Sequence, residues 1–361
     1  MEIPKTMQAA VLFGHRDLKI VEKPVPEPGP GEVLLKVNCC AICGTDLHMV
    51  DHPFPAQPAY GEFTPGHEYA GTVVALGPTV DEVQVGDRVA IEVHKGCGRC
   101  VNCLKGMYTA CLNYGNMHKG HRSWGFTTGG GYAEYALNHV NTIHRLPDAI
   151  SFEESTIITT AGTVLYGLET AGGYIAGDTI AIIGPGPIGL ISVQVCRALC
   201  ADKIFLIGTR DSRLNLGKEF GAHVTINVNK ENPVARVREL TGGLGVDLAI
   251  DCAGGANTLN DCIRMVKKGH DLLLLTFYGD SVTADISEAV RNDTTIYTIR
   301  GEGRHNLQRA ISLARQGKLQ LAPLITHRFP LDQIQQAFHT FRERIGEAIK
   351  VIVQIERTES I

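Results

Sequence analysis

The chain has 361 residues, of which 44% are hydrophobic and 20% are charged, and its formal net charge at pH 7 is −4. This length is long for one hydrophobic core and suits two domains, while the weak charge gives no support for nucleic acid or an anionic membrane as a partner. The start of the sequence shows no secretion signal, and no apolar segment approaches the roughly 20 residues of a membrane span. We therefore expect a cytoplasmic protein whose eleven cysteines are reduced and, where clustered, are candidates for metal binding.

The first third of the chain contains short segments of strand composition separated by turns, at residues 31–37, 71–76 and 87–93. After about residue 150, short and almost wholly apolar runs alternate with segments of helical periodicity. The expected buried strands are residues 178–184, 203–208, 247–252 and 271–277, with helices at 187–200, 212–222, 306–318 and 331–341 and a closing strand at 348–355. Buried strands that alternate with helices predict an α/β fold with a doubly wound parallel sheet.

A glycine-rich turn follows the first of these buried strands and opens the next helix. Gly184, Gly186 and Gly189 have the spacing G-x-G-x-x-G. In this setting the first glycine allows a tight turn, the second lets a pyrophosphate approach the backbone, and the third lets helix and strand pack closely. The phosphate then lies at a helix N-terminus, which favours an anion. The spacing alone is weak evidence in a chain with 40 glycines, but strand, turn and helix together predict a dinucleotide site.

The end of the second buried strand bears on the choice between NAD and NADP. NAD sites usually have an acidic residue there for the ribose 2′-hydroxyl, and this sequence has Gly208. Without a carboxylate nothing repels a 2′-phosphate, and Arg210 and Arg213 can supply positive charge. NADP is therefore favoured, with two alternatives open: Asp211 turns back to the ribose of NAD, or both arginines are ordinary surface residues. The candidate cofactor-binding residues are Gly184, Gly186, Pro187, Ile188, Gly189, Gly208, Thr209, Arg210 and Arg213.

Four cysteines lie close together in the segment GCGRCVNCLKGMYTAC. Cys97, Cys100, Cys103 and Cys111 have the spacing C-x2-C-x2-C-x7-C. Four thiolates on one compact loop can complete a tetrahedral zinc site that leaves no coordination position open, and such sites are structural. We therefore expect a structural zinc in this loop, and any reactive metal must be bound elsewhere.

Four segments in consistent order resemble one family over nearly the whole chain. They are CGTDLH at residues 43–48, GHEYAGTVVALG at 66–77, the cysteine loop at 95–113 and GPGPIG at 184–189. Together they resemble the zinc-dependent medium-chain alcohol dehydrogenases, and the polyol (sorbitol) and threonine dehydrogenase branch is the most similar. The resemblance implies a GroES-like catalytic domain at residues 1–155, a Rossmann domain at 156–300, and a return of residues 301–361 to the catalytic domain.

The resemblance also implies residues for a catalytic zinc. Cys43 and His67 would be ligands, Thr45 would pass on the proton of the substrate, and His48 would be the next group of that relay or a plain surface histidine. These residue types suit the chemistry, because an alcohol bound to zinc loses its proton near neutral pH far more easily than a free one. A hydroxyl and an imidazole can then conduct that proton to solvent.

The third ligand that the family pattern requires is missing. Alignment places it at Thr159 or Thr160, and a neutral hydroxyl is a poor zinc ligand. Zinc with one thiolate and one neutral imidazole keeps a charge of about +1. Glu68 would bring that charge to about zero, so it is our first choice for the third ligand. The alternatives are that Glu68 only supports the ligands while waters complete the site, that the site holds no metal, or that another nearby donor binds, namely Glu62, Asp46 or His94.

The leading prediction is an enzyme, a zinc-dependent NAD(P)(H) oxidoreductase that transfers hydride between a secondary alcohol of polyol or sugar type and its ketone. Two other hypotheses stay open. One is a metal-independent NADPH reductase of activated carbonyls or double bonds, and the other is a non-catalytic nucleotide-binding protein of crystallin type. We expect a small-molecule substrate, no nucleic acid or membrane partner, and assembly into a homodimer or homotetramer.

Overall fold

The apolar runs after residue 178 form one parallel sheet in the computed structural model, which describes residues 2–279 and 281–356. The strand order is β12-β11-β10-β13-β14-β15, and every neighbouring pair is parallel. Numbered from β10, this order is 3-2-1-4-5-6, which is that of a Rossmann dinucleotide-binding fold. The predicted α/β fold with a doubly wound parallel sheet is therefore confirmed. The strands are β10 (Thr179–Ile183), β11 (Lys203–Gly208), β12 (Val224–Asn227), β13 (Val246–Asp251), β14 (Val266–Leu274) and β15 (Thr295–Thr298).

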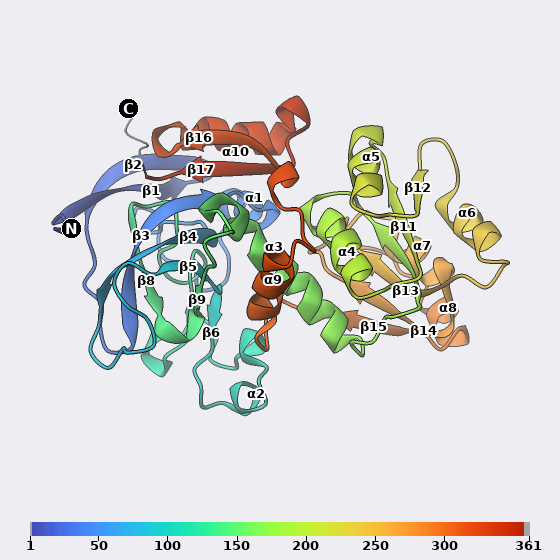
Figure 1. Ribbon diagram of the computed structural model, residues 1–361, viewed down its shortest axis with the longest axis horizontal. Helices are drawn as coiled ribbons and strands as arrows, with labels where there is room; N and C mark the ends of the chain where they lie inside the picture. The colour runs from blue at the N-terminus through green and yellow to red at the C-terminus, as the bar shows by residue number, and fades with distance from the viewer. Residues whose placement is uncertain (1, 280, 357–361) are drawn as a thin grey trace. The chain divides into compact units, whose positions relative to one another are not determined.

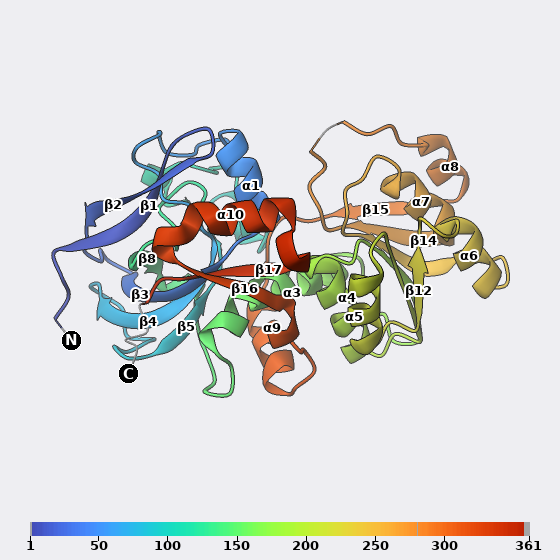
Figure 2. The same cartoon turned by 90° about the horizontal axis from the view of Figure 1, so that it is seen from above.

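Helices cover both faces of this sheet (Figures 1 and 2). The crossovers between parallel strands are right-handed, so reversing the direction of strand addition moves the connecting helices to the other face. Figure 2 shows α4 and α5 on one face and α6 and α7 on the other. These helices are α4 (Pro187–Ala198), α5 (Asp211–Glu219), α6 (Pro233–Leu240) and α7 (Thr258–Met265), and the shorter α8 (Ile286–Arg291) packs beside α7.

The two edge strands of the sheet, β12 and β15, were not predicted from the sequence. Each has four residues, and β15 has no fully buried side chain. An edge strand buries less of its surface than a central one, so it does not need a continuous apolar run. The central strands were predicted because they are covered on both sides.

The remainder of the chain forms a β-rich unit from both ends of the sequence. This unit comprises residues 1–159, 301–315 and 321–361, whereas the α/β unit comprises residues 160–300 and 316–320. The main sheet of the β-rich unit has the order β16-β17-β3-β4-β5-β9, and β8 also pairs with β3. Two small antiparallel pairs accompany this sheet, β1 with β2 and β6 with β7. The strands are β1 (Thr6–Gly14), β2 (Asp17–Pro24), β3 (Glu32–Ala41), β4 (Glu68–Leu76), β5 (Arg88–Ile91), β6 (His94–Lys95), β7 (Arg122–Ser123), β8 (Tyr135–His139), β9 (Ile143–Arg145), β16 (Ile325–Pro330) and β17 (Lys350–Gln354).

Five further α-helices lie in the described part of the chain, and four of them belong wholly to the β-rich unit. They are α1 (Gly44–Asp51), α2 (Val101–Leu104), α9 (Asn306–Arg315) and α10 (Ile334–Glu343), while the fifth, α3 (Phe152–Thr170), runs from this unit into the α/β unit. Within the described residues, no helix is both long enough and apolar enough to cross a membrane.

The register of three strands brings distant parts of the sequence together. β3 pairs antiparallel with β4, and Ala41 lies opposite Glu68. β17 pairs antiparallel with the other side of β3, and Ile352 also lies opposite Ala41. The residues just after Ala41, just before Glu68 and just before Ile352 therefore meet at one end of this sheet.

Candidate metal centre and cofactor site

Cys43, His67 and Glu68 form a cluster at this end of the β-rich sheet. Cys43 caps the N-terminus of α1 immediately after β3, while His67 and Glu68 stand where β4 begins. One ligand atom from each of the three lies within 4.8 Å of the others. A thiolate, an imidazole and a carboxylate make a donor set that zinc accepts. The three residues therefore fit a metal ion, although Cys43 lies 24 positions before His67 in the sequence.

Asp46 orients the imidazole of His67. Its Oδ1 lies 3.2 Å from Nδ1 of His67, and because a carboxylate can only accept, the proton is on Nδ1. Nε2 of His67 is then the nitrogen with a lone pair for a metal. Asp46 is fully buried and also accepts hydrogen bonds from the backbone N–H of Cys43 at 2.9 Å and from the hydroxyl of Tyr132 at 3.0 Å. One carboxylate thus fixes both the thiol-bearing and the imidazole-bearing segments.

Tyr132 remains a hydrogen-bond donor to Asp46 across the accessible pH range. Its side chain is fully buried, and burial together with the charge of Asp46 raises the pKa of its phenol well above the usual value. The thiol of Cys40 lies in the same region and is also fully buried, and its pKa is likewise raised, chiefly by burial and next by the charge of Asp46. Cys40 is therefore a neutral, packed thiol, in contrast to the half-buried Cys43.

Lys350 is a buried cation beside this cluster. It is 1% exposed, and its Nζ donates to Oε2 of Glu68. Burial lowers the pKa of Lys350, but the charge of Glu68, the neighbouring charges of Cys43 and Asp46 and the hydrogen bond to Glu68 together outweigh burial, so the net shift is upward and the side chain is charged. A zinc ion with Cys43 thiolate, Glu68 carboxylate and Lys350 ammonium would carry a formal charge of about +1. Lys350 therefore opposes part of the neutralisation that Glu68 supplies.

Thr45 and His48 lead from the cluster toward solvent. Oγ1 of Thr45 lies 3.7 Å from Sγ of Cys43, and the threonine is half-buried. His48 is exposed and stands three residues further along α1, on the same face of the helix as Thr45. The two side chains have the order along the helix that a proton relay would need.

The other donors considered from the sequence do not join the cluster. Glu62 is exposed, and Asp46 supports His67 as described above. His94 is buried and contacts Phe126, whose ring also contacts His67, with centroid distances of 6.1 Å and 4.7 Å. Among the described residues, the group that converges here contains Cys43, His67 and Glu68 alone.

Thr159 and Thr160, which align with the missing ligand, are both buried in α3 at 5% exposure. Both side chains are neutral hydroxyls, so neither offers the anionic donor that the family pattern has at this place.

The four-cysteine loop has the geometry of a closed tetrahedral site. Sγ of Cys97 lies 3.9 Å from Sγ of Cys103, and Sγ of Cys100 lies 4.0 Å from Sγ of Cys111. Four thiolates bound to one zinc at 2.3 Å would be about 3.8 Å apart. The observed spacing therefore fits zinc without rearrangement.

Hydrogen bonds to sulfur support the same conclusion. The side-chain amide of Asn113 donates to Sγ of Cys97 at 3.2 Å, and the backbone N–H of Cys103 donates to Sγ of Cys100 at 3.4 Å. Bonds from the backbone N–H of Arg99 and from Asn113 lower the pKa of Cys97 to about 5. The pKa of Cys100 is lowered too, chiefly by the backbone N–H of Cys103, whereas burial raises the pKa of Cys103 to about 12 and that of Cys111. Hydrogen bonds in the loop thus stabilise the thiolates of Cys97 and Cys100, which are the form that binds metal.

The glycine-rich turn of the α/β unit forms the expected cradle. Gly184 has φ +102°, and a Cβ there would lie 2.9 Å from Ala253. Gly186 caps the N-terminus of α4 and has no atom within 4 Å of its Cβ position, while a Cβ on Gly189 would overlap the carbonyl of Gly184. Open space over the helix N-terminus, with tight packing on either side of it, is what a bound pyrophosphate requires.

The end of β11 gives a packing reason for Gly208. A Cβ on Gly208 would overlap the ring of Pro185, so the absence of a carboxylate at this position is explained without reference to a cofactor. The two oxygens of Asp211 accept hydrogen bonds from Asn227 and Lys230, each at 2.7 Å. The bond from Lys230, and next that from Asn227, lowers the pKa of Asp211. Both oxygens of Asp211 are thus already engaged within the α/β unit, and the side chain would have to turn from these partners to approach a ribose, which weakens the NAD alternative.

Arg210 and Arg213 are both half-buried at the N-terminus of α5, where Arg210 is the capping residue. Their position just after β11 is the one from which a 2′-phosphate is bound in folds of this type.

Comparisons with known proteins agree with this geometry. Residues 29–148 match the alcohol dehydrogenase GroES-like domain, and residues 187–316 match the zinc-binding dehydrogenase domain. The L-threonine 3-dehydrogenase of Pyrococcus horikoshii is 34% identical over 94% of this chain and 95% of its own length. The sorbitol dehydrogenase of Bacillus subtilis is 29% identical over 98% of this chain and 99% of its own. A solved zinc-binding dehydrogenase of Sinorhizobium meliloti bound to NADP superposes with a TM-score of 0.88 at 28% identity, covering 98% of this chain and all of that one.

The chain belongs to the zinc-dependent medium-chain alcohol dehydrogenase family. It is accordingly a zinc-binding, nicotinamide-dependent oxidoreductase that interconverts a secondary alcohol and its ketone by hydride transfer. The predictions of family, fold class and enzymatic function are confirmed, and so is a zinc and nicotinamide requirement in general. In this family a β-rich GroES-like domain and a Rossmann domain correspond to the two units described above.

Sequence reasoning missed the residues that hydrogen-bond to the candidate ligands, or to Asp46, without being ligands themselves. Lys350 stands in the segment AIKVIVQI, where a lysine at the start of an otherwise apolar strand is a signal that it has a buried partner. Tyr132 precedes an unremarkable strand and carries no such signal. The role of Asp46, considered only as a possible ligand, follows from the turn that starts α1.

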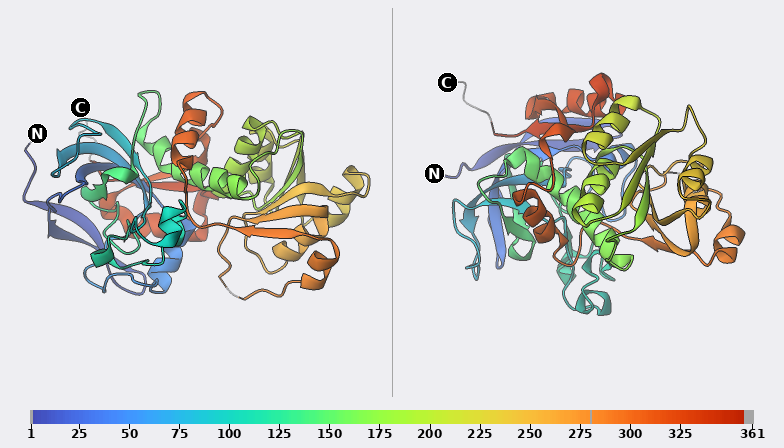
Figure 3. Two further views of the ribbon diagram at one scale, coloured as in Figure 1. Left: turned by 90° about the horizontal axis from the view of Figure 1, so that it is seen from below. Right: turned by 45° about the vertical axis from the view of Figure 1, so that its right-hand side comes forward.

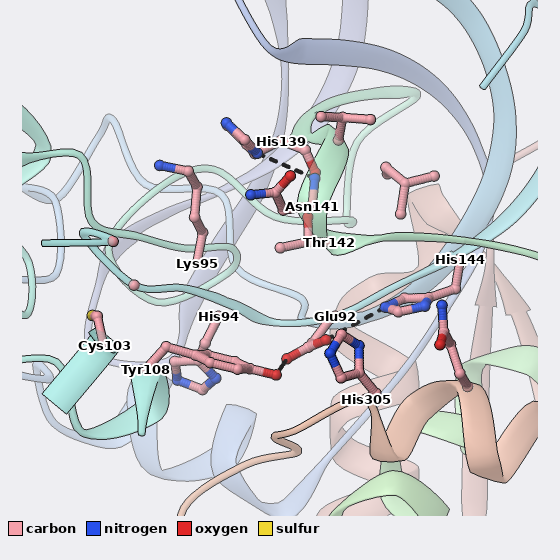
Figure 4. Close-up of a pocket in the computed structure, with 15 residues that line it drawn as sticks. Glu92, His94, Lys95, Cys103, Tyr108, His139, Asn141, Thr142, His144 and His305 are labelled. Atoms are coloured by element: carbon pink, nitrogen blue, oxygen red, sulfur yellow. Dashed lines mark hydrogen bonds and ion pairs between the residues drawn. The ribbon is translucent and has the colours of Figure 1, made fainter. Parts of the chain in front are cut away.

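A cavity of about 630 Å³ also lies in the β-rich unit of this dehydrogenase (Figure 4). Glu92 on its wall accepts hydrogen bonds from the hydroxyl of Tyr108 and, at 3.4 Å, from Nε2 of His144. Glu302 lies nearby in the core at 1% exposure and accepts the backbone N–H of Val93 at 2.5 Å. Burial, and next the charge of Glu92, raises the pKa of Glu302 to about 8. These groups hold the segment between β5 and β6 in place.

Proposed function

We propose that Cys43, His67 and Glu68 hold the catalytic zinc of this enzyme. The observation that carries the proposal is the convergence of their ligand atoms within 4.8 Å, with Asp46 holding Nδ1 of His67. Glu68 takes the place of the third ligand, because Thr159 and Thr160 offer only neutral hydroxyls. Cys97, Cys100, Cys103 and Cys111 hold a second zinc with a structural role.

The chemistry divides between the cofactors and the chain. Zinc bound at the cluster supplies a Lewis acid that lowers the pKa of the substrate hydroxyl, and the oxidised nicotinamide accepts the hydride. Thr45 receives the hydroxyl proton, since its Oγ1 lies 3.7 Å from Sγ of Cys43, and the exposed imidazole of His48 passes the proton to solvent. In the reverse direction the same groups return a proton to the ketone oxygen.

The substrate that we propose is a secondary alcohol with a polar neighbour, of polyol or sugar type. Support comes from the names of similar proteins, which include a sorbitol dehydrogenase and a 2R,3R-butanediol dehydrogenase, both of Bacillus subtilis. A vicinal hydroxyl group would let a substrate bind through two oxygens rather than one, which raises specificity.

NADP is the cofactor that we propose for the Rossmann unit. Its pyrophosphate would lie over Gly184, Gly186, Pro187, Ile188 and Gly189. The 2′-phosphate would lie beyond Gly208 and Thr209, near Arg210 and Arg213. The argument rests on these arginines and on the partners of Asp211, and no longer on Gly208.

We also propose a homodimer or homotetramer that works in the reducing cytosol, where thiolate zinc sites are stable.

Metal analysis combined with a substrate panel in both cofactors tests the proposal. We expect two zincs per chain, turnover of polyols or other secondary alcohols, and a kcat/KM with NADP that is about tenfold or more above that with NAD. Arg210→Ala should reduce this preference, with Lys218→Ala as the matched control because Lys218 is an exposed cation in the last turn of the same helix. Equal use of both cofactors by the unaltered enzyme would contradict the NADP assignment.

A second candidate function is favoured by one observation, the neutral threonines at 159 and 160. If the cluster holds no zinc in the active enzyme, the chain is a metal-independent NADPH reductase of activated carbonyls. One zinc per chain together with turnover would establish that alternative, and one zinc without turnover on a broad panel would point to a non-catalytic nucleotide-binding protein.

A further inference from the structure

The cavity shown in Figure 4 lies beside a segment that leaves the main sheet of the β-rich unit and returns to it. β6 and β7 pair with each other and so close this segment, which comprises residues 94–123. Figure 1 and the right-hand view of Figure 3 show the segment, with α2 at its tip, extending away from the main sheet. Among the described residues, those that line the cavity do not include Cys43, His67 or Glu68, so it is separate from the candidate catalytic metal centre. Its volume of about 630 Å³ is enough for a small-molecule ligand.

Two cations lie directly opposite each other where this segment closes. Lys95 of β6 pairs with Arg122 of β7 in antiparallel register. Residues that are directly opposite in such a pair share a face, and like charges there are destabilising. Nζ of Lys95 donates to the carbonyl of Gly120 at 2.9 Å, and the guanidinium of Arg122 donates to two other backbone carbonyls. In the described part of the chain neither side chain forms an ion pair, so the structure keeps two cations together without a carboxylate between them.

A third basic group, His139, lies close to this pair. Burial, and next the charges of Lys95 and Arg122, lower the pKa of His139 to about 4. Nδ1 of His139 accepts a hydrogen bond from the backbone N–H of Asn141 at 3.2 Å, so Nε2 carries the proton of the neutral ring. Figure 4 shows the side chains of Lys95 and His139 at the same end of the cavity, on the side away from Glu92. This end therefore offers an ammonium group and an N–H donor.

Two acidic residues act on this end of the cavity without neutralising it. Glu32 and Glu82 each accept a backbone N–H of a nearby residue at 3.1 Å. Their charges act on Lys95 and on His139 respectively, but more weakly than the charge of Arg122 does. Neither carboxylate forms an ion pair with these groups within the described residues.

The charge of the whole segment is also positive. Residues 94–123 contain five lysines and arginines and no aspartate or glutamate. A zinc ion with the four proposed thiolate ligands would add about −2, which leaves a surplus of about +3. The cations at the base of the segment are therefore not fully compensated by the structural metal site, and an anion would be stabilised there.

We infer that this cavity binds a phosphate monoester of a small polyhydroxy compound, with the phosphate at the end formed by Lys95 and His139. A phosphate monoester carries a charge of about −1.5 to −2 at neutral pH, which matches the two cations Lys95 and Arg122, whereas a single carboxylate would match only one of them. Asn141 and Gln308 are exposed and line the same cavity. Their amides offer both donors and acceptors to the hydroxyl groups of such a ligand.

The opposite end of the cavity sets the direction of the ligand. Glu92 lies there, is 4% exposed, and accepts hydrogen bonds from Tyr108 and His144. A phosphate would be repelled from this carboxylate and drawn to the cationic end. His305 also lines the cavity, and its φ of +64° is uncommon for a residue other than glycine, a strain that is typical of binding sites. The inference goes beyond the proposed catalytic function and does not depend on it.

Isothermal titration calorimetry of the zinc-loaded protein without nicotinamide cofactor tests the inference, with glucose 6-phosphate, glucose and inorganic phosphate as probes. We expect saturable binding of one glucose 6-phosphate per chain. Inorganic phosphate lacks the hydroxyl contacts and should bind about tenfold or more weakly, and glucose lacks the charge and should bind weakest. Inorganic phosphate that binds as tightly as glucose 6-phosphate would overturn the assignment of a monoester.

Lys95→Gln locates the bound phosphate. The amide can still donate to the carbonyl of Gly120 but has no charge, so the dissociation constant for glucose 6-phosphate should rise about tenfold or more. Lys119→Gln is the matched control, because Lys119 is an exposed cation of the same segment that does not line the cavity. Arg210→Ala is a second control, which tests for binding at the cofactor site of the α/β unit. Both controls should leave the affinity unchanged.

Zinc content verifies that the Lys95→Gln protein keeps the fold of its cysteine segment. If that variant loses its structural zinc, Gln308→Glu replaces it, because Gln308 lies on α9 outside the segment and the new carboxylate should repel the ligand about as strongly. Absence of saturable glucose 6-phosphate binding to the unaltered protein would overturn the inference. Equal weakening by Lys95→Gln and Lys119→Gln, or weakening by Arg210→Ala, would do so as well, and each result would leave the enzymatic proposal intact.

Discussion

Residues 94–123, which we call the zinc lobe, and the Cys43 cluster both bring thiols together in a geometry that fits a metal, but the chain builds them in opposite ways. The four ligands that we propose for the lobe all come from residues 97–111, and hydrogen bonds within the lobe are donated to their sulfur atoms. The cluster takes its ligands from the ends of two strands and depends on further groups at positions 46, 132 and 350. Four thiolates from one loop would fill every coordination position of a zinc ion. Three ligands brought together by strand register would leave a coordination position for substrate, and the neighbouring residues can change the charge at the metal.

The difference extends to charge. Four thiolates around one zinc leave no position for a substrate and no excess positive charge. The cluster offers one thiolate and one carboxylate, and Lys350 donates to that carboxylate and so offsets its negative charge. A metal in the cluster would therefore stay more electrophilic than one in the lobe, which suits the activation of a hydroxyl group.

The largest expected effect is the loss of turnover in Cys43→Ala. Without the thiolate, the cluster keeps only an imidazole and a carboxylate that Lys350 already binds, so the catalytic zinc should be lost. We expect kcat/KM to fall by about 10⁴-fold, while one zinc per chain and the affinity for NADP are retained. Steady-state kinetics, zinc analysis and fluorescence titration of the cofactor measure the three quantities.

Cys100→Ser and Cys200→Ser complete this comparison. Cys100→Ser should also reduce the zinc content to one per chain, but with a larger fall in thermal stability than Cys43→Ala, because the lobe has few buried side chains besides its metal site. Cys200 is exposed and belongs to neither site, so its substitution should keep both zincs and full activity. Unchanged turnover in Cys43→Ala would exclude a zinc mechanism at this cluster.

The two sites also differ in how far the sequence predicts them. The spacing of the lobe cysteines is sufficient to predict a zinc site, because all its ligands are local. For the cluster, family resemblance supplies Cys43, His67 and Glu68, but Lys350 depends on the pairing of β17 with β3, and register over 300 residues is not visible in a sequence. The fold follows the same rule, since buried central strands have apolar runs whereas the edge strands β12 and β15 do not.

The next largest effect should come from Lys350→Met. The ion pair with Glu68 is buried on both sides, and in the zinc-free protein removal of Lys350 leaves the carboxylate without compensation, so we expect that protein to lose about 3–5 kcal/mol in its free energy of unfolding. The pKa of Lys350 is raised, so the pair stays intact at neutral pH and is lost only above the ordinary lysine value of about 10.4. Urea denaturation at neutral pH measures the change.

Two variants calibrate this loss of stability. Lys350→Arg keeps the positive charge and should therefore retain most of the stability that Lys350→Met loses. Lys230→Met breaks the exposed pair with Asp211, and in the absence of cofactor it should leave the free energy of unfolding nearly unchanged, because water screens this pair. A Lys350→Met protein as stable as the unaltered one would show that the buried pair adds nothing to the cluster's support.

A smaller effect is expected from Asp46→Asn, which weakens the support of the cluster without removing a ligand. The amide can no longer hold Nδ1 of His67 through a charged acceptor, and loss of such a partner typically reduces metal affinity 10–100-fold. Competition with a chelator measures the zinc affinity directly. Tyr132→Phe removes only one donor to the same carboxylate and should give a smaller reduction, so equal affinities in all three proteins would contradict the proposed role of Asp46.

The smallest expected effect concerns Glu302, which fixes the backbone from which the zinc lobe departs. Its pKa is raised to about 8, chiefly by burial and next by the charge of Glu92. The hydrogen bond from the backbone N–H of Val93 and, less strongly, the charge of His67 oppose this rise, and Tyr108 also faces this group. An unfolded glutamate has a pKa of about 4.3, so between that pH and 8 the folded protein binds more protons than the unfolded one. Stability from this residue is therefore complete below the lower value and declines as the pH rises to about 8. Glu302→Gln should flatten the fall in melting temperature between about pH 5 and about pH 8, and because the amide cannot ionise, an identical slope in both proteins would mean that Glu302 does not titrate in this range.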